Sequence, residues 1–512
     1  MALRYRVESF AVTIEDNSPR RELNPSRQIV ASKSKLPRSV VVASQLTTRA
    51  QVNGYRFLIR RLEHALIRRD VRMLHDPMSV QWRSLLVGLV LGLLGVAGAA
   101  ILSFLRPQGA VDNNAVIIGK DSGALYVMLN GTLHPALNLA SARLIAGADA
   151  APTSVKESQL VDYPRGPMLG IPGAPATLPG SAESGSDWTA CDATTPVSGA
   201  STLVFAGQPR QDRSVHPLGR DEAVLVSVHG TTYLLYDGKH AEVDLTDDVI
   251  ARSLKLAGAQ PRAVGAGLLD ATVPVPAIAL PAVPMAGQPG PVVGAKVGSV
   301  IKVNGINSSE LYVVVTTGVQ PISAFAAEVL RNANSVGDSD VIQVTPDALS
   351  GVPVVNTLAL NDFPVQRPKV LSADDFPVVC SSWSKPGDDR DATIGLTTAK
   401  TWPLPASATP VPMASGGVGP DRIDTAYLRP SSGEFVQITG IVPGSVRRDG
   451  LFYIADTGIR YGIPDPGTAK MLGMPAQPKL APWEIVGLLI PGPELTRSAA
   501  LVAHDTLPDR RK

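Results

Sequence analysis

One long apolar stretch interrupts the mixed pattern of hydrophobic and polar residues in this chain. Residues 84–105 carry no charged side chain over 22 positions, and Arg83 and Arg106 bracket them. A bilayer-spanning helix needs about 20 such residues, whereas a buried helix of a soluble protein is rarely apolar on every face. We therefore predict a transmembrane helix over 84–105. It begins far from Met1 and no A-x-A site follows it, so we expect an uncleaved signal anchor.

The basic residues around this stretch are distributed unevenly. Arg106 and Lys120 follow it closely, whereas the positions before it hold Arg60, Arg61, Arg68, Arg69, Arg72 and Arg83. Since loops rich in Lys and Arg stay in the cytoplasm, we predict a cytoplasmic N-terminus and place residues 106–512 on the outer side.

Small residues recur along one side of the predicted span. Gly88 and Gly92 form a G-x-x-x-G motif, which Gly95 and Ala99 extend. Such a stripe lets a second helix approach closely. We predict helix packing at Gly88 and Gly92; ordinary use of glycine and alanine in a span is the alternative.

A second helical pattern precedes the span. Between Thr47 and His75, apolar residues recur at steps of three and four, as on one face of a helix: Val52, Tyr55, Ile59, Leu62 and Leu66. Thr47 or Thr48 can cap this helix, and Asp76-Pro77 ends it. Other positions are basic, including the candidate docking residues Arg56, Arg60, Arg61, Arg68 and Arg69. We predict a cytoplasmic amphipathic region over 45–83 that docks on anionic lipid or on a partner, although a solvated face is the alternative. Residues 1–44 show no sustained period and are predicted to be a disordered tail.

Four segments of the outer part share one plan of strand, turn, strand and helix. They are Ser122–Ile145, His229–Leu254, Ser308–Ala333 and Arg448–Gly473. Each has a tyrosine in an apolar run and then a glycine that suits a tight turn: Tyr126 and Gly131, Tyr233 and Gly238, Tyr312 and Gly318, Tyr453 and Gly458. The irregular spacing argues against a solenoid.

These patterns define the predicted fold class, which is α+β. We expect one transmembrane helix and a β-rich outer domain in which four small modules surround a central β region. The modules are predicted near 112–150, 218–272, 297–351 and 447–508, and the central parts near 185–217 and 365–446. Proline-rich connectors lie between them, and Met168, Leu169 and Ile171 favour packing of the connector over 163–179 rather than solvation.

Composition adds a charge asymmetry. The chain has 512 residues and a net charge of +2, but Met1–Arg83 hold 16 Lys and Arg against seven Asp and Glu. That part therefore carries +9 and the remainder −7, which excludes a uniformly basic nucleic-acid binder. The two cysteines, Cys191 and Cys380, both fall on the predicted outer side, where an oxidising compartment permits a disulfide. Two free buried cysteines are the alternative.

Catalytic motifs are missing from the sequence. It has no G-x-x-x-x-G-K-[ST], H-E-x-x-H or G-x-S-x-G. The nearest approach to a phosphate-binding loop is NAVIIGKD, which ends at Asp121 and has Asp at the position of the Mg²⁺-binding hydroxyl. The seven histidines form no metal-ligand spacing. We therefore expect no catalytic site, no cofactor and no metal.

Four long segments resemble the EccB family, the single-span membrane subunit of type VII (ESX) secretion systems. One is VNGYRFLIRRLEHALIRRDVRM (Val52–Met73) and another is DSGALYVMLNGTLHPALNLASARLIAG (Asp121–Gly147). RGPMLGIPGAPATLP (Arg165–Pro179) is followed by Trp188 and Cys191, and APWEIVGLLIPGPELTRSAALVAHDTLP (Ala481–Pro508) completes the set.

The resemblance implies a structural role. It suggests an inner-membrane protein whose periplasmic domain has four modules, a central β region and a disulfide, here Cys191 with Cys380. It implies assembly with an EccC-type motor ATPase, EccD, EccE and the mycosin protease in a hexameric complex that exports WXG-type substrates. Two alternatives stay open: a periplasmic module that binds cell-wall glycans, and a nucleotide hydrolase, since the family has been labelled as ATPases.

Overall fold

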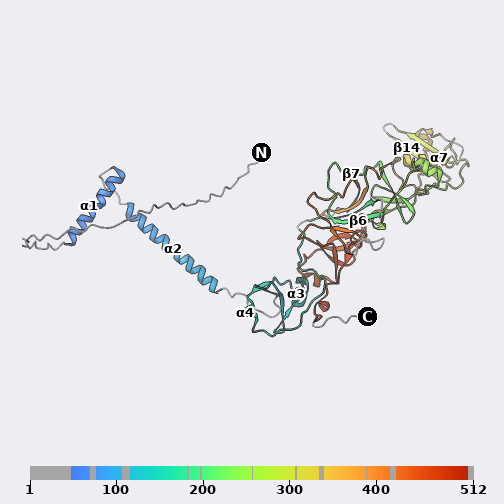
Figure 1. Cartoon of the computed structure of the whole chain (residues 1–512). Helices are drawn as coiled ribbons and strands as arrows, with labels where there is room; N and C mark the ends of the chain where they lie inside the picture. Colours follow the sequence, from blue (N-terminus) through green and yellow to red (C-terminus); the bar gives the residue numbers. More distant parts are fainter. Residues whose placement is uncertain are drawn as a thin grey trace, which may run out of the picture. The chain divides into compact units, whose positions relative to one another are not determined.

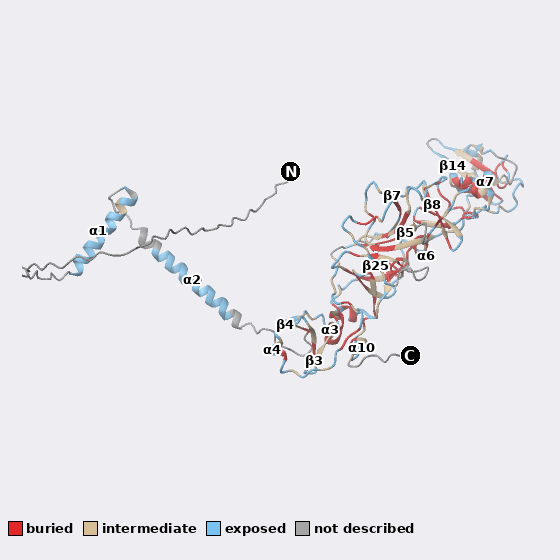
Figure 2. Ribbon diagram, in the orientation of Figure 1, coloured by how far each residue is buried: buried red, intermediate tan, exposed pale blue. Residues whose placement is uncertain are grey.

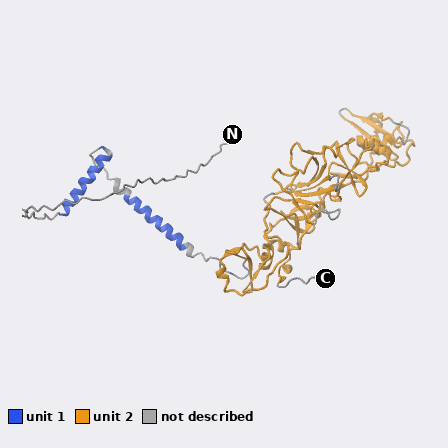
Figure 3. Ribbon diagram, in the orientation of Figure 1, with its two compact units in different colours: residues 1–106 blue, residues 107–512 orange. Residues whose placement is uncertain are grey.

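The chain forms two compact units, residues 1–106 and 107–512 (Figure 3). The computed structural model describes residues 48–69, 77–105, 116–181, 184–195, 199–256, 258–305, 308–333, 340–387, 390–414 and 423–504. The tail predicted for 1–44 lies outside these residues.

The first unit contains the amphipathic helix α1, Arg49–Arg68. At its start the Thr48 N–H donates to Gln51 Oε1 at 3.0 Å, as in a capping box. Arg69 adopts φ +52° and donates its N–H to the Ala65 carbonyl. This left-handed residue ends the helix before the predicted limit at His75, because the next peptide no longer points along the helix axis. Residues 70–76 lie outside the described part.

The second helix of this unit, α2, runs from Pro77 to Leu105 (Figure 1). Proline suits the first position of a helix because its missing N–H would have no partner there. Within α2, Trp82–Ile101 form a segment of mean hydropathy 2.4 that is long and apolar enough to cross a membrane, and none of it is buried. This helix contains the predicted span and extends it toward the N-terminus.

The second unit is built from four copies of one topology. In each module, three antiparallel strands are followed by a helix, then by a strand parallel to the first and a segment parallel to the third. The first module comprises β1 (Val116–Gly119), β2 (Leu125–Leu129), β3 (Thr132–Pro135), α3 (Leu139–Ala146), β4 (Thr153–Val155) and α4 (Glu157–Leu160). The second comprises β8 (Glu222–Val228), β9 (Thr231–Tyr236), β10 (Lys239–Glu242), α5 (Asp248–Ser253), β11 (Arg262–Ala263), α6 (Ala266–Asp270) and β12 (Val273–Pro274).

The third and fourth modules repeat this order. The third comprises β13 (Val300–Asn304), β14 (Ser309–Val315), β15 (Gly318–Ile322), α7 (Ala324–Ala333), β16 (Ile342–Val344) and the 3₁₀ helix Pro346–Leu349. The fourth comprises β22 (Gly433–Thr439), β23 (Leu451–Ala455), β24 (Ile459–Ile463), α8 (Pro466–Met471), β25 (Lys479–Pro482), α9 (Trp483–Val486), β26 (Ile490–Pro491) and α10 (Arg497–Ala500).

A seven-stranded central sheet joins the modules, so the predicted α+β class is confirmed. Its order is β20-β21-β6-β5-β18-β19-β7. The strands are β5 (Ser186–Thr195), β6 (Gly199–Ala206), β7 (Val215–Pro217), β18 (Val378–Lys385), β19 (Thr393–Ala399), β20 (Val411–Pro412) and β21 (Thr425–Tyr427). The second and third modules are inserted between β7 and β18, so strands distant in sequence become neighbours.

Two predicted boundaries were wrong. The fourth module begins at Gly433 rather than near 447, because β22 pairs with β23 across an 11-residue loop that hides their relationship in the sequence. The short strand β17 (Lys369–Val370) pairs with β8 of the second module, although it falls in the stretch predicted as central.

The predicted hairpin glycines have two different roles. Asn130-Gly131 and Asp237-Gly238 both have positive φ, between 47° and 78°, as the turns of tight hairpins require. Gly318 does not have a positive φ; a Cβ there would lie 2.1 Å from the Pro353 carbonyl oxygen. Glycine is needed at that position because a connector packs against the strand, not because the chain turns.

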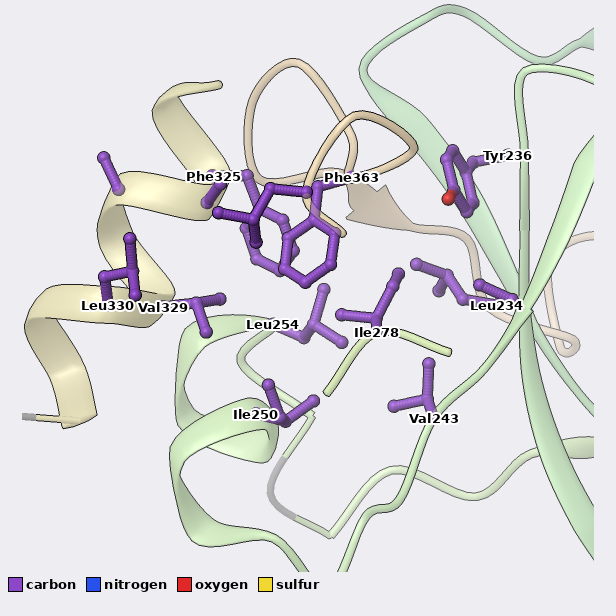
Figure 4. Close-up of a cluster of buried hydrophobic side chains, with 14 of the residues drawn as sticks. Leu234, Tyr236, Val243, Ile250, Leu254, Ile278, Phe325, Val329, Leu330 and Phe363 are labelled. Atoms are coloured by element: carbon purple, nitrogen blue, oxygen red, sulfur yellow. The ribbon is translucent and has the colours of Figure 1, made fainter. Parts of the chain in front are cut away.

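The modules pack in pairs. Residues of the second and third share one core, in which α5 and α7 face each other; Figure 4 shows Ile250 and Leu254 beside Phe325 and Val329. The first and fourth share another, which includes Leu144 of α3 and Leu472 beside α8. Buried residues accordingly run through every module of this unit (Figure 2). Each module is too small to bury its sheet face alone, so pairing supplies the missing cover.

The connector 163–179 lies within the pairing of the first and fourth modules. Leu169 and Ile171 are buried, as predicted, whereas Met168 is exposed and the packing predicted for it was wrong. Two tyrosines of the fourth module donate to its backbone: Tyr453 to Pro179 O at 3.1 Å and Tyr461 to Gly173 O at 3.0 Å. The connector is therefore a packed structural element.

Candidate functional surfaces

The apolar stripe of α1 is uncovered. Its residues are 39–79% exposed: Val52, Tyr55, Ile59, Leu62 and Leu66. Arg56, Arg60 and Arg61 are exposed on the same helix, Arg68 is its last residue and Arg69 is its C-cap. An isolated helix of this length gains most of its stability from packing its apolar face, so α1 has the features of a docking helix.

The glycines of α2 present a flat strip. A Cβ at Gly88 or Gly92 would meet no described heavy atom within 4 Å, and the same holds for Gly95. At 100° per residue these three positions fall on one side of the helix, whereas Gly98 lies about 60–120° away from them. This strip is open to a neighbouring helix.

Cys191 and Cys380 form a disulfide, with their Cα atoms 4.0 Å apart. They lie directly opposite each other on β5 and β18, the neighbouring middle strands of the central sheet. The bond therefore closes the chain around the inserted second and third modules, which occupy much of the 189-residue separation.

The turn after β1, the nearest approach to a phosphate-binding loop, is filled by a side chain of the protein itself. The Glu157 carboxylate accepts from Asp121 N at 3.0 Å, Ser122 N at 2.8 Å and Ser122 Oγ at 2.7 Å. A hydrogen bond shared with the Asp121 carboxyl, together with the Ser122 donors, lowers the pKa of Glu157 to about 2, and the shared bond raises the pKa of Asp121. The donors that would hold a phosphate thus bind an internal anion.

Two histidines of the second unit contact polar side chains of the protein itself. His216 Nε2 lies 2.6 Å from Glu222 Oε2, and His240 Nδ1 lies 2.7 Å from Thr272 Oγ1. Burial lowers the pKa of His240. Within the described residues, no group of three or more His, Cys, Asp or Glu side chains could hold a metal ion.

Sequence reasoning missed two residues with unusual environments. Glu157 binds a turn 35 residues away, and Asp192 is buried between the central sheet and the second module. Neither belongs to a short motif, because the partner of each is supplied by the fold. The one local sequence feature that could have drawn attention to Asp192 is its position next to a cysteine within a β-strand pattern.

The fold and surfaces define a class of protein: a single-span membrane protein with a modular, β-rich outer domain stapled by a disulfide. A family model described as "Type VII secretion system ESX-1, transport TM domain B" matches residues 44–509. The chain belongs to this family, EccB.

Curated relatives match along nearly their whole length. The chain is 38% identical to "ESX-1 secretion system ATPase EccB1" of Mycobacterium tuberculosis, over 91% of this chain and 96% of that protein. It is 35% identical to "ESX-3 secretion system ATPase EccB3" of Mycolicibacterium smegmatis, over 92% and 93% of the two chains.

Solved structures show the same architecture. A chain of an intact ESX-5 inner membrane complex matches with a TM-score of 0.68 and 32% identity, covering 92% of this chain and 98% of that one. A chain of an EccB3 dimer from the ESX-3 core complex matches with a TM-score of 0.66 and 34% identity, covering 76% and 100%.

Proposed function

We propose that this protein is a structural subunit of a type VII (ESX) secretion inner-membrane complex, which anchors and assembles the periplasmic part of the export channel. The observation that carries this proposal is the full-length similarity to a subunit of a solved ESX inner membrane complex. The span in α2 and the packed modules of the second unit suit such a role, because anchoring and assembly need surfaces rather than a reaction centre.

The orientation follows from charge. The arginines before α2 favour a cytoplasmic N-terminus, and the modules then lie in the periplasm. The Cys191–Cys380 disulfide supports this assignment, since disulfides persist in oxidising compartments.

The expected partners lie on both sides of the membrane and within it. α1 docks on a cytoplasmic surface of the complex, the Gly88–Gly92 strip packs against a partner helix, and the outer modules associate with other copies of the chain. The partners are an EccC-type motor ATPase, EccD, EccE and the mycosin protease, in a complex of hexameric symmetry that exports WXG-type substrates.

Purification of the tagged full-length chain from native membranes in mild detergent tests this function. Native mass measurement and peptide identification are expected to find a megadalton particle that contains EccC-, EccD- and EccE-like chains. A lone monomer or small homo-oligomer, recovered under conditions that preserve another membrane complex of the same cells, would overturn the proposal.

A further inference from the structure

Asp192 is an unusual carboxylate in the middle of the outer unit. It lies on β5 beside Cys191 and is 1% exposed. Its Oδ2 accepts the Gly265 N–H at 2.6 Å. Its Oδ1 is buried and has no hydrogen-bond partner among the described residues. A buried carboxylate normally has a cation or several donors to offset its lost hydration; Asp192 has the Gly265 N–H and Thr202 as donors, and no cation of the described residues is among the groups that act on it.

The neighbours of Asp192 on the central sheet add a second negative charge. Thr202 of β6 lies directly opposite Asp192. Asp424, next to β21, is joined to Thr202 on its other side: Thr202 N donates to Asp424 Oδ2 at 2.7 Å, and Asp424 N donates to Thr202 O at 2.9 Å. The two carboxylates therefore flank one threonine on adjacent strands.

Among the described residues, no cation is found to act on Asp192. Val379, opposite Asp192 on β18, is apolar. The buried Arg262 precedes α6 by only a few residues, but its guanidinium donates to Leu371 O and Phe376 O. Asp424 is the charged group that acts on Asp192.

The contact from Asp192 crosses a junction between two parts of the fold. Gly265 is the N-cap of α6 in the second module, whereas Asp192 belongs to the central sheet. Around it, Val264 and Leu268 of the second module pack with Val379 of the central sheet in one apolar cluster. The Asp192 carboxylate thus lies in the otherwise apolar interface between the central sheet and the second module, hereafter the joint.

Burial, together with the charge of Asp424, raises the pKa of Asp192 to about 6, against hydrogen bonds from Thr202 and Gly265 that lower it. The pKa of an aspartate in the unfolded chain is near 4. Between pH 4 and 6, Asp192 therefore binds more protons when α6 covers it than when the joint has opened and exposed it to water. Stability of the joint is therefore greatest when Asp192 is protonated, and it falls as the pH rises through 6.

We propose that the joint between the central sheet and the second module is acid-strengthened, with Asp192 as its proton-binding group. Protonation removes the repulsion between Asp192 and Asp424, and the neutral carboxyl keeps an oxygen that accepts from Gly265. The paired second and third modules are consequently held more firmly to the central sheet in acidic surroundings.

Hydrogen exchange of the full-length chain in detergent tests this proposal. The rates of peptides covering 262–271 are measured between pH 5 and 7.5 and corrected for intrinsic exchange. The opening constant is expected to be about tenfold smaller at pH 5 than at pH 7.5, whereas helix α3 of the first module keeps a constant value. An opening constant at 262–271 that does not change over this range would overturn the proposal.

Two matched variants assign the effect. Asp192→Asn mimics the neutral carboxyl, so its opening constant is expected to stay near the wild-type acidic value at every pH. Asp424→Asn removes the neighbouring charge and is expected to keep the transition but shift it to lower pH. A full wild-type pH dependence in Asp192→Asn would assign the effect to another group and refute the role of Asp192. If Asp192→Asn does not fold, Asp424→Asn decides, because a transition that stays at the wild-type pH contradicts the proposed repulsion between Asp192 and Asp424.

Discussion

Trp188 and Trp383 lie directly opposite each other on β5 and β18, three positions along the strands from the opposed pair Cys191 and Cys380. Because side chains alternate along a strand, the tryptophans and the disulfide face opposite sides of the central sheet. The tryptophans pack with the fourth module, and the disulfide lies in a separate core cluster. One pair of strands thus carries the largest buried side chains on one face and the covalent staple on the other.

The two tryptophans are not equivalent. Trp188 Nε1 donates to Ser186 Oγ at 3.0 Å, whereas Trp383 Nε1 is buried with no acceptor among the described residues. Trp383→Phe removes an unsatisfied donor and Trp188→Phe breaks a hydrogen bond, so we expect Trp188→Phe to cost about 1 kcal/mol more. Denaturant unfolding of the two variants measures this difference. A greater loss in Trp383→Phe would contradict it.

Loss of the disulfide is expected to destabilise the outer unit. Replacement of Cys191 and Cys380 by serine should lower its free energy of unfolding by about 2–5 kcal/mol, since the bond restricts a long loop of the unfolded chain. Unfolding under oxidising and reducing conditions provides the control, because only the wild type should respond to the reductant. The staple interpretation fails if stability is unchanged.

The glycine strip of α2 is expected to mediate helix packing. Leucines at Gly88 and Gly92 would fill the open strip and keep a partner helix away. The recovery of the large membrane complex should fall severalfold, while insertion of the chain is retained. Gly98→Leu, which adds the same bulk about 80–120° around the helix from Gly88 and Gly92, is the matched control and should leave recovery unchanged. Equal losses in both variants would argue against a specific strip.

The basic residues of α1 are expected to hold it on an anionic surface. Substitution of Arg56, Arg60 and Arg61 by glutamine removes three exposed charges. At about 1 kcal/mol for each basic residue near such a surface, docking should weaken roughly a hundredfold. Co-purification of partner chains at low and high salt measures this loss. Glu63→Gln, which removes the opposite charge from the same helix, should not weaken docking.

The turn after β1 depends on ionised Glu157. Because hydrogen bonding lowers its pKa to about 2, its support is present above the unfolded value near 4.5 and is lost as the pH falls toward 2. Glu157→Gln should therefore speed amide exchange at Asp121 and Ser122 at neutral pH, while Glu494→Gln in the fourth module should have no effect there. Unchanged exchange in Glu157→Gln would show that the turn holds without its internal anion.

Particular residues show which structural features could be predicted from the sequence alone. The span in α2, the amphipathic face of α1 and the turns at Gly131 and Gly238 were predictable because each depends on residues within one or two helical turns or one hairpin. Three of the four hairpin glycines lie in the left-handed region. Gly318 is not the left-handed turn residue that the pattern predicted. Glycine is required there because a Cβ would clash with the carbonyl oxygen of Pro353, 35 residues later.

Tertiary structure alone decided the rest. Which modules pair, why β22 belongs with β23, and how Glu157 fills a distant turn all depend on shape and on partners far along the chain. The burial of Asp192 is of the same kind, since α6 covers it only after the second module has docked on the central sheet. Hydrophobic periodicity indicates which face of a helix or strand is apolar and will be buried, but not which other element packs against that face. The sequence by itself therefore determined the membrane anchor, the repeated modules and the family resemblance, and packing between distant segments determined the joints.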